Sequence, residues 1–98
     1  MTPNNTYGSP MQALSQKVAY TGTAGTITNA TPTNTACVRV IATTDCFIEI
    51  TAAGTAAVAD TGLYLPALVP EYFAAGGAVK VSAIQVASGG TIYVTPFA

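Results

Sequence analysis

Histidine is absent from this 98-residue chain, and charged side chains make up only 7% of it. Without histidine the chain lacks the commonest general base and the commonest zinc ligand, and it cannot form a Ser-His or Cys-His pair. Ordinary soluble domains carry about 25% charged residues. Such a scarcity predicts a surface that is kept soluble by hydroxyl groups or is covered by partners, because exposed apolar patches usually mark interaction sites.

Basic side chains are equally scarce. They are Lys17, Arg39 and Lys80, and the net charge is −1. Three scattered cations do not form the basic patch that neutralises several phosphates, so we expect no nucleic-acid partner. No apolar run approaches the ~20 residues of a membrane span, and the start "MTPNNTYGSP" lacks the basic and apolar regions of a signal peptide. We therefore expect no membrane partner and synthesis in the cytoplasm.

The remaining polar residues offer little for catalysis. The acids are Asp45, Glu49, Asp60 and Glu71. They do not cluster as in a calcium loop, and the pairs Gly76-Gly77 and Gly89-Gly90 lack the lysine of a phosphate-binding loop. Lys17 beside Ser15 is more simply explained as surface charge than as a serine–lysine dyad. We expect no catalytic residues, no cofactor and no metal, and therefore no enzyme.

Strand signals dominate from Lys17 onward. Thr, Val, Ile and Tyr alternate with turn signals such as "NATPTNT", "AAGG" and "SGG", and no segment has a helical stripe. Strands are expected over residues 17–22, 37–43, 46–51, 79–87 and 91–95, and the Ala-rich residues 51–62 are expected to form a loop or a short strand. The pattern predicts an all-β domain over residues 17–98, a small antiparallel β-sandwich or barrel.

Residues 1–16 are polar and rich in Pro, Asn and Ser, so they cannot form a core of their own. We expect an extended N-terminal arm. Two interpretations remain open for it: a disordered terminus, or an arm that lies across a neighbouring subunit with Tyr7 and Met11 as its anchors.

Two hairpins are predicted from the alternation of apolar residues. In "CVRVIATTDCFIEIT", a loop at residues 43–45 would place Val40 opposite Ile48 and Arg39 opposite Glu49. In "VKVSAIQVASGGTIYVT", a loop at residues 88–90 would place Ile84 opposite Val94. A change of phase near Ser82-Ala83 predicts a bulge in the second hairpin.

The first hairpin register also bears on the two cysteines. It places Cys37 and Cys46 on opposite faces and about 17 Å apart along the strands, at ~3.3 Å per residue. A disulfide requires Cα atoms within about 7 Å of each other. We therefore predict two free, buried thiols in a protein that folds in a reducing cytosol.

The stretch "GLYLPALVPEYFAAGG", Gly62 to Gly77, combines two prolines with apolar and aromatic side chains. Its prolines exclude a helix interior and make it a poor central strand. Its aromatic rings are either core residues or part of a protein-binding patch. On the second interpretation the stretch is a rigid apolar ridge. The candidate interface residues are then Tyr64, Leu65, Pro66, Val69, Pro70, Glu71, Tyr72 and Phe73, with Tyr7 and Met11 from the arm.

The same stretch contributes to a family resemblance. The run "VRVIATTDCFIEI" followed by "LYLPALVPEYFAAGGAVKVSAIQVASGGTIYVT" resembles small all-β structural proteins from the heads of tailed bacteriophages. The elements that carry it are "TTDC", "LPALVPEYF", "KVSAIQ" and "GTIYVT", within residues 37–95. The resemblance implies a homotrimeric cement or decoration protein on the capsid exterior of the virion, with the major capsid protein as its partner.

Two other functions stay open at this stage. A neck, tail or fibre component would share the all-β fold and the lack of catalytic residues. A receptor- or carbohydrate-binding module would use the tyrosines, provided that they are exposed.

Overall fold

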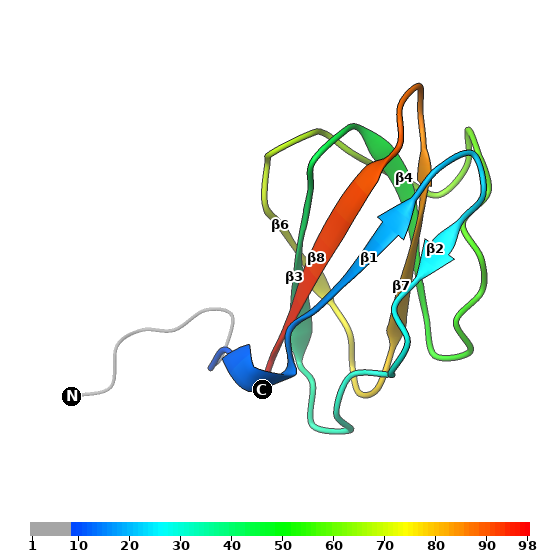
Figure 1. Cartoon of the computed structure of the whole chain (residues 1–98). Helices are drawn as coiled ribbons and strands as arrows, with labels where there is room; N and C mark the ends of the chain where they lie inside the picture. The colour runs from blue at the N-terminus through cyan, green and yellow to red at the C-terminus, as the bar shows by residue number, and fades with distance from the viewer. Residues whose placement is uncertain (1–8) are drawn as a thin grey trace.

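Two four-stranded antiparallel sheets face each other in the computed structural model, which describes residues 9–98 (Figure 1). This confirms the predicted all-β sandwich. The elements are the 3-10 turn η1 (Gln12–Leu14) and the strands β1 (Gln16–Tyr20), β2 (Gly25–Thr26), β3 (Cys37–Ala42), β4 (Cys46–Thr51), β5 (Leu63–Leu65), β6 (Glu71–Ala74), β7 (Lys80–Gln85) and β8 (Gly90–Phe97).

The chain alternates between the two sheets. Sheet A has the strand order β1-β8-β3-β6, and sheet B has the order β2-β7-β4-β5. Only β4 and β5 follow each other in sequence within one sheet; every other connection crosses the sandwich. This strand order is that of the eight-stranded jelly roll, in which two Greek keys are wound together.

Both predicted hairpins are wrong. β3 pairs with β8 and β6, whereas β4 pairs with β7 and β5, so Val40 lies opposite Val94 and Ile48 lies opposite Ala83. β7 and β8 likewise belong to different sheets. Alternation shows only which face of each strand is buried. Two strands joined by a short loop bury the same residues whether they pair side by side in one sheet or face each other across the core.

The predicted bulge at Ser82-Ala83 is also wrong. β7 pairs with β4 without interruption from Lys80 to Gln85. Val81 and Ala83 lie in the core, while Ser82 is buried on the opposite face of the sheet. There the backbone N–H of Ala57 donates a 2.9 Å hydrogen bond to Ser82 Oγ. The change of phase therefore reflects a strand that is covered on both faces, and residues 52–62 form the loop that covers one of them.

The proline-containing stretch forms two short strands with a loop between them. β5 lies at the edge of sheet B and β6 at the edge of sheet A. Pro66 and Pro70 lie in the connecting loop, where no ladder hydrogen bond is needed from their missing N–H groups. The prediction that this stretch would not supply a central strand is confirmed.

The core lies between the sheets and contains one of the cysteines. Its fully buried side chains include Ile48, Val81 and Ile92, and Cys46 is 0% exposed among them. Cys37 faces outward from β3 but is also buried, and neither cysteine forms a disulfide bond, as predicted. The hairpin register from which this was predicted is nevertheless wrong, because β3 and β4 lie in different sheets. Burial raises the pKa of Cys46 to about 11 and also raises the pKa of Cys37.

The described part of the arm contacts its own chain. Ser9 and Ala98 exchange two backbone hydrogen bonds of 3.0 and 2.8 Å, and the N–H of Met11 donates a 2.8 Å bond to the carbonyl of Pro96. Residues 9–11 thus run antiparallel to the end of β8, and the Met11 side chain is half-buried. Tyr7, the other predicted anchor, lies outside the described residues. Within residues 9–98, no helix is long and apolar enough to cross a membrane.

Candidate functional site

The crossing connections gather at one end of the sandwich. Four loops, at residues 21–24, 43–45, 66–70 and 86–89, each join a strand of one sheet to a strand of the other. They lie together at the upper end of the molecule in Figure 1. We call this surface the four-loop end, and the loop at residues 66–70 the proline loop.

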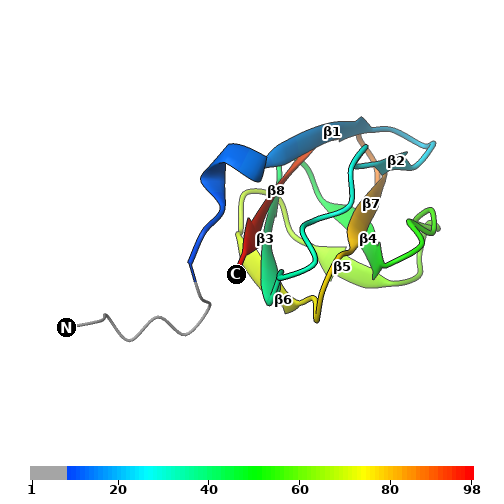
Figure 2. The ribbon, with the colours of Figure 1, turned by 90° about the horizontal axis from the view of Figure 1, so that it is seen from below.

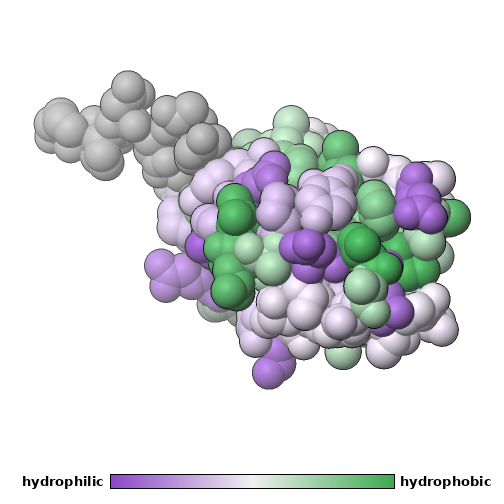
Figure 3. Space-filling view, turned by 90° about the horizontal axis from the view of Figure 1, so that it is seen from above, coloured by the Kyte–Doolittle hydropathy of each residue, from purple (hydrophilic) through white to green (hydrophobic). Residues whose placement is uncertain are grey.

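The proline loop exposes the largest apolar side chain of this end. Leu68 is 69% exposed and Val69 is 46% exposed, between Pro66 and Pro70. Figure 3 looks down on this end and shows apolar groups gathered in patches within a neutral to hydrophilic surface. An exposed leucine alone is unremarkable in a folded protein, but its conformation sets this one apart.

Leu68 has a left-handed backbone, with φ at +63°. This conformation is uncommon for residues other than glycine, and holding it costs on the order of 1–3 kcal/mol. Two hydrogen bonds hold it in place. The N–H of Leu68 donates to the carbonyl of Ala42 at 2.8 Å, and the N–H of Ala67 donates to Asp45 Oδ1 at 2.7 Å.

Asp45 joins the loop after β3 to the proline loop. Its Oδ2 accepts a 2.7 Å hydrogen bond from the Tyr64 hydroxyl, while its Oδ1 accepts the bond from Ala67. Hydrogen bonds from Tyr64 and then from Ala67 stabilise the carboxylate and lower the pKa of Asp45, whereas the pKa of Tyr64 is raised by the same bond. The Tyr64 ring also packs edge-to-face on Phe47 of the neighbouring strand, with ring centroids 5.6 Å apart.

A buried tyrosine supports the loop that carries Asp45. The hydroxyl of Tyr20, which is 2% exposed, donates to the Thr44 carbonyl at 2.6 Å. Thr44 Oγ1 in turn donates to the carbonyl of Ser88 at 3.1 Å. Beside these loops is a surface hollow of about 290 Å³, lined by Thr43, Thr44, Asp45, Ala67, Val86, Ala87 and Ser88. Three of the four loops are therefore tied together by side-chain hydrogen bonds.

The Asp45–Tyr64 pair predicts a dependence of stability on pH. Because the pKa of Asp45 is lowered in the fold, its contribution is present above the unfolded pKa of about 3.9 and is lost as pH falls through the lower folded value. The raised pKa of Tyr64 adds stability below its unfolded pKa of about 10, which is lost as pH rises through the folded value. Denaturant midpoints measured across the pH range should therefore fall at both extremes.

The Tyr64→Phe variant is the control for this prediction. It keeps the ring that packs on Phe47 but removes the hydroxyl that donates to Asp45. Its midpoint is expected to vary less with pH than that of the wild type, in both the acid and the alkaline range. Equal pH dependence in the two proteins would mean that this hydrogen bond does not contribute to stability.

The structure places the predicted interface residues in three environments: the core, the outer sides of the two sheets, and the proline loop with the start of β6. Leu65 is fully buried in the core, and Phe73 packs against the core from β6, so neither side chain forms an exposed ridge. Tyr64 is on the outer side of sheet B and Tyr72 on the outer side of sheet A, where it packs edge-to-face on Phe97 at 5.6 Å between ring centroids.

Pro66, Val69 and Pro70 do lie together in the proline loop, and half-buried Glu71 follows them at the start of β6. Leu68, the most exposed apolar residue there, was not among the predicted interface residues. Its position midway between the two prolines was the only sequence signal available.

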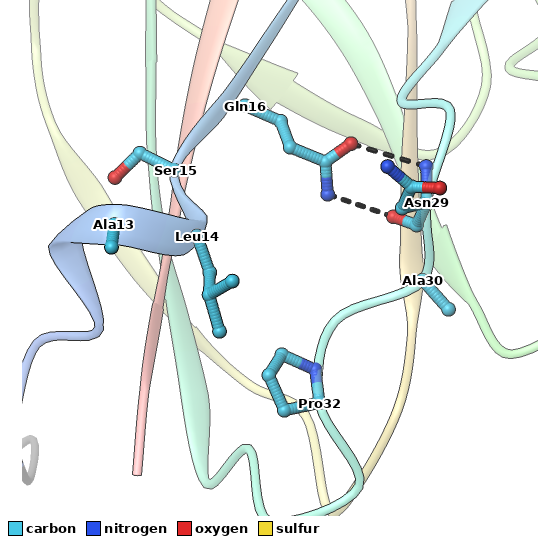
Figure 4. A pocket seen from close by; sticks show the side chains of 7 residues that line it. All are labelled: Ala13, Leu14, Ser15, Gln16, Asn29, Ala30 and Pro32. Carbon is cyan, nitrogen blue, oxygen red and sulfur yellow. Dashed lines mark hydrogen bonds between the residues drawn. The ribbon is translucent and has the colours of Figure 1, made fainter.

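A second hollow lies at the opposite end, where the arm meets the loop between β2 and β3 (Figure 4). Its volume is about 280 Å³, and its lining residues are Ala13, Leu14, Ser15, Gln16, Asn29, Ala30 and Pro32. Two hydrogen bonds close one side: Gln16 Nε2 donates to the Asn29 carbonyl at 2.8 Å, and the Asn29 N–H donates to Gln16 Oε1 at 3.1 Å. No ionisable side chain lines this hollow, so the chemistry it offers is limited to packing and hydrogen bonding.

No family model, no curated protein and no solved structure matches this chain. Within residues 9–98, no group of three or more His, Cys, Asp or Glu side chains is placed to hold a metal ion. Function is therefore inferred from the residues of the four-loop end and from the surface chemistry of the sandwich.

Proposed function

We propose that this chain is a structural, non-catalytic protein of a tailed-bacteriophage virion, a capsid cement or decoration protein. It is made in the host cytoplasm, assembles as a homotrimer and binds the outside of the major capsid protein lattice where capsomers meet. The sequence resemblance over residues 37–95 and the low charge support this proposal. A jelly roll serves many unrelated functions, so the strand order adds no weight of its own.

The observation that carries the proposal is the exposed, left-handed Leu68. A folded protein retains strained backbone where the surrounding structure enforces it, and such residues cluster at functional sites. Here the hydrogen bonds to Ala42 and Asp45 enforce the strain, and the result is a leucine that is 69% exposed. We infer that Leu68 enters an apolar pocket of the capsid protein.

Rigidity makes the proline loop suited to such binding. Ordering a loop at an interface consumes part of the binding free energy, and a loop that is already held loses less. Burying one leucine side chain contributes about 1.5–3 kcal/mol. Three such loops on one trimer would bind together with much greater avidity than a single loop.

Replacing Leu68 by Ser is expected to reduce capsid binding by about 2 kcal/mol or more, roughly thirtyfold in affinity. The variant should remain folded, because the Leu68 side chain points into solvent. Co-sedimentation with capsids that lack this protein measures the binding, and circular dichroism checks the fold. Leu14→Ser is the matched control: it removes another exposed leucine, 49% exposed, which lines the hollow at the opposite end of the sandwich (Figure 4).

Several outcomes would contradict the proposal. Wild-type occupancy by folded Leu68→Ser protein would show that the proline loop is not the contact. Purified virions with about six or twelve copies, as expected for a neck or tail ring, would place the protein outside the capsid lattice, which requires hundreds. Failure of the wild-type protein to bind any capsid, together with specific binding to a glycan array, would support a carbohydrate-binding module instead.

A further inference from the structure

The two outer faces of the sandwich differ in what covers them. The outer face of sheet B lies under the loop at residues 52–62, which is attached through the Ala57 hydrogen bond to Ser82. At the outer face of sheet A, the hydroxyl of Ser15, which immediately precedes β1, is hydrogen-bonded to Thr95 Oγ1 at 3.0 Å. Two of the three basic side chains of the whole chain, Lys17 and Arg39, project from that face. None of the outward-facing residues on its four strands is acidic.

A hollow of about 540 Å³ lies between these two cations. It is lined by Ser15, Gln16, Lys17, Arg39, Ile41, Tyr93 and Thr95. Tyr93 is opposite Lys17 on one side and Ile41 on the other, while Arg39 is opposite Thr95 in the next row. At ~4.8 Å between strands and ~6.7 Å between alternate residues, the Cα atoms of Lys17 and Arg39 are about 12 Å apart. Both side chains are long enough to reach over the Tyr93 ring, which is 43% exposed.

The loop on sheet B presents a complementary pair of side chains. Val58 is 57% exposed, and Asp60 is exposed with a left-handed backbone, φ +65°. A tight turn holds them: the Val58 carbonyl accepts bonds from the N–H of Thr61 at 3.2 Å and from its Oγ1 at 3.0 Å. Figure 2 shows this green loop projecting on the side of the molecule remote from sheet A.

We propose that the outer face of sheet A binds the Val58–Asp60 turn of a second copy of this chain. Val58 packs against Ile41 and the Tyr93 ring. The Asp60 carboxylate lies between the two cations, where the arginine fork and the lysine ammonium both donate to it. The turn therefore offers one apolar and one acidic side chain to a hollow that is lined by apolar and basic side chains.

A second copy is favoured over other acidic partners by the distribution of charge. The basic face and the acidic turn occur in the same molecule, on opposite sides, in a chain whose net charge is only −1. Complementary patches of this kind steer association and set its orientation. The contact is heterologous, so it closes into a ring where the rotation between copies permits and otherwise extends as a chain. Because the two patches lie on opposite sides of each copy, the contact favours an open chain over a closed trimer.

Two matched variants test the contact. One carries Lys17→Ala and Arg39→Ala on the sheet A face; the other carries Val58→Ser and Asp60→Asn in the turn, where Asn tolerates the left-handed backbone. Each is expected to self-associate at least about tenfold more weakly than the wild type in sedimentation velocity. Because each retains the half that the other lacks, an equimolar mixture is expected to form 1:1 dimers and nothing larger. Added salt should weaken association of the wild type.

Glu71→Gln, which removes an acid outside the turn, and Leu68→Ser should both self-associate like the wild type. The assay uses the isolated protein without capsids, so its result is separate from that of the capsid-binding test. A wild-type protein that stays monomeric to about millimolar concentration would overturn the proposal. So would unchanged association of either double variant, once circular dichroism shows it to be folded, or a mixture that forms no dimers. A loss of association in the sheet A variant alone would mean that the hollow binds another segment of the second copy and not the Val58–Asp60 turn.

Discussion

Replacing Leu65 by Ala is expected to lower the free energy of unfolding by about 2–5 kcal/mol. The Leu65 side chain is 0% exposed and belongs to the core cluster, although it lies on the edge strand β5. Its removal takes away buried apolar surface and leaves a cavity that the surrounding strands fill only in part. Because a small domain has only about 5–15 kcal/mol of total stability, this loss is a large share of it. Urea denaturation of the purified protein measures the effect.

Leu68→Ala is the matched control, three residues further along the same segment. Its side chain is 69% exposed, so the same chemical change should alter stability by no more than about 0.5 kcal/mol. The pair separates the two interpretations of the proline-containing stretch, since Leu65 serves folding and Leu68 is free for binding. Equal losses at both positions would mean that Leu68 is packed against the domain and unavailable to a partner.

Replacing Gly25 by Ala is expected to be the other strongly destabilising change. A Cβ atom at Gly25 would overlap the carbonyl oxygen of Ala19, at the point where the chain crosses from β1 to β2. The Ala19 oxygen is a backbone atom and the position of a Cβ is fixed by its own backbone, so no side-chain rotation relieves the overlap and the strands themselves must move apart. Overpacking of this kind costs about 1–3 kcal/mol, occasionally more, and we expect the upper part of that range. The urea midpoint of the variant measures it.

Gly22→Ala in the same connection is the control. The nearest atom to a Cβ at Gly22 is Gln85 Nε2 at 3.7 Å, an ordinary van der Waals distance to a flexible side chain. This variant should be as stable as the wild type, or slightly more stable because alanine restricts the unfolded chain. A stable Gly25→Ala protein would show that β1 and β2 do not approach each other as closely as described.

The strands themselves could be predicted because their signals are local. Residues 46–51 were expected as a strand and form β4, and residues 37–43 correspond to β3 within one residue. Alternating Val, Ile and Cys side chains in these segments indicate one buried face, whatever the partner strand. β2, β5 and β6 were not predicted as strands, because segments of two to four residues are too short to show a period.

Strand pairing could not be predicted from the same pattern. The connection at residues 43–45 is short enough for a hairpin, yet it crosses to the other sheet. The choice depends on contacts far away in sequence, such as the register of Val40 with Val94, whose partners the local alternation does not identify. The expected pairing of Arg39 with Glu49 failed for this reason, and Arg39 lies instead between Thr95 and Tyr72 on the outer face of sheet A.

By itself the sequence determined the all-β class, the scarcity of charge and the position of the prolines, because each depends on composition or local pattern. Only the tertiary structure decided that Leu68 projects in a left-handed conformation, since the groups that hold it, the Ala42 carbonyl and the Asp45 carboxylate, come from β3 and the loop that follows it. It also decided which cations share a face. The Leu68 conformation and the shared face of the two cations both depend on contacts between segments that are distant in sequence. Such contacts are set by hydrogen bonds and strand register, which exist only in the folded chain.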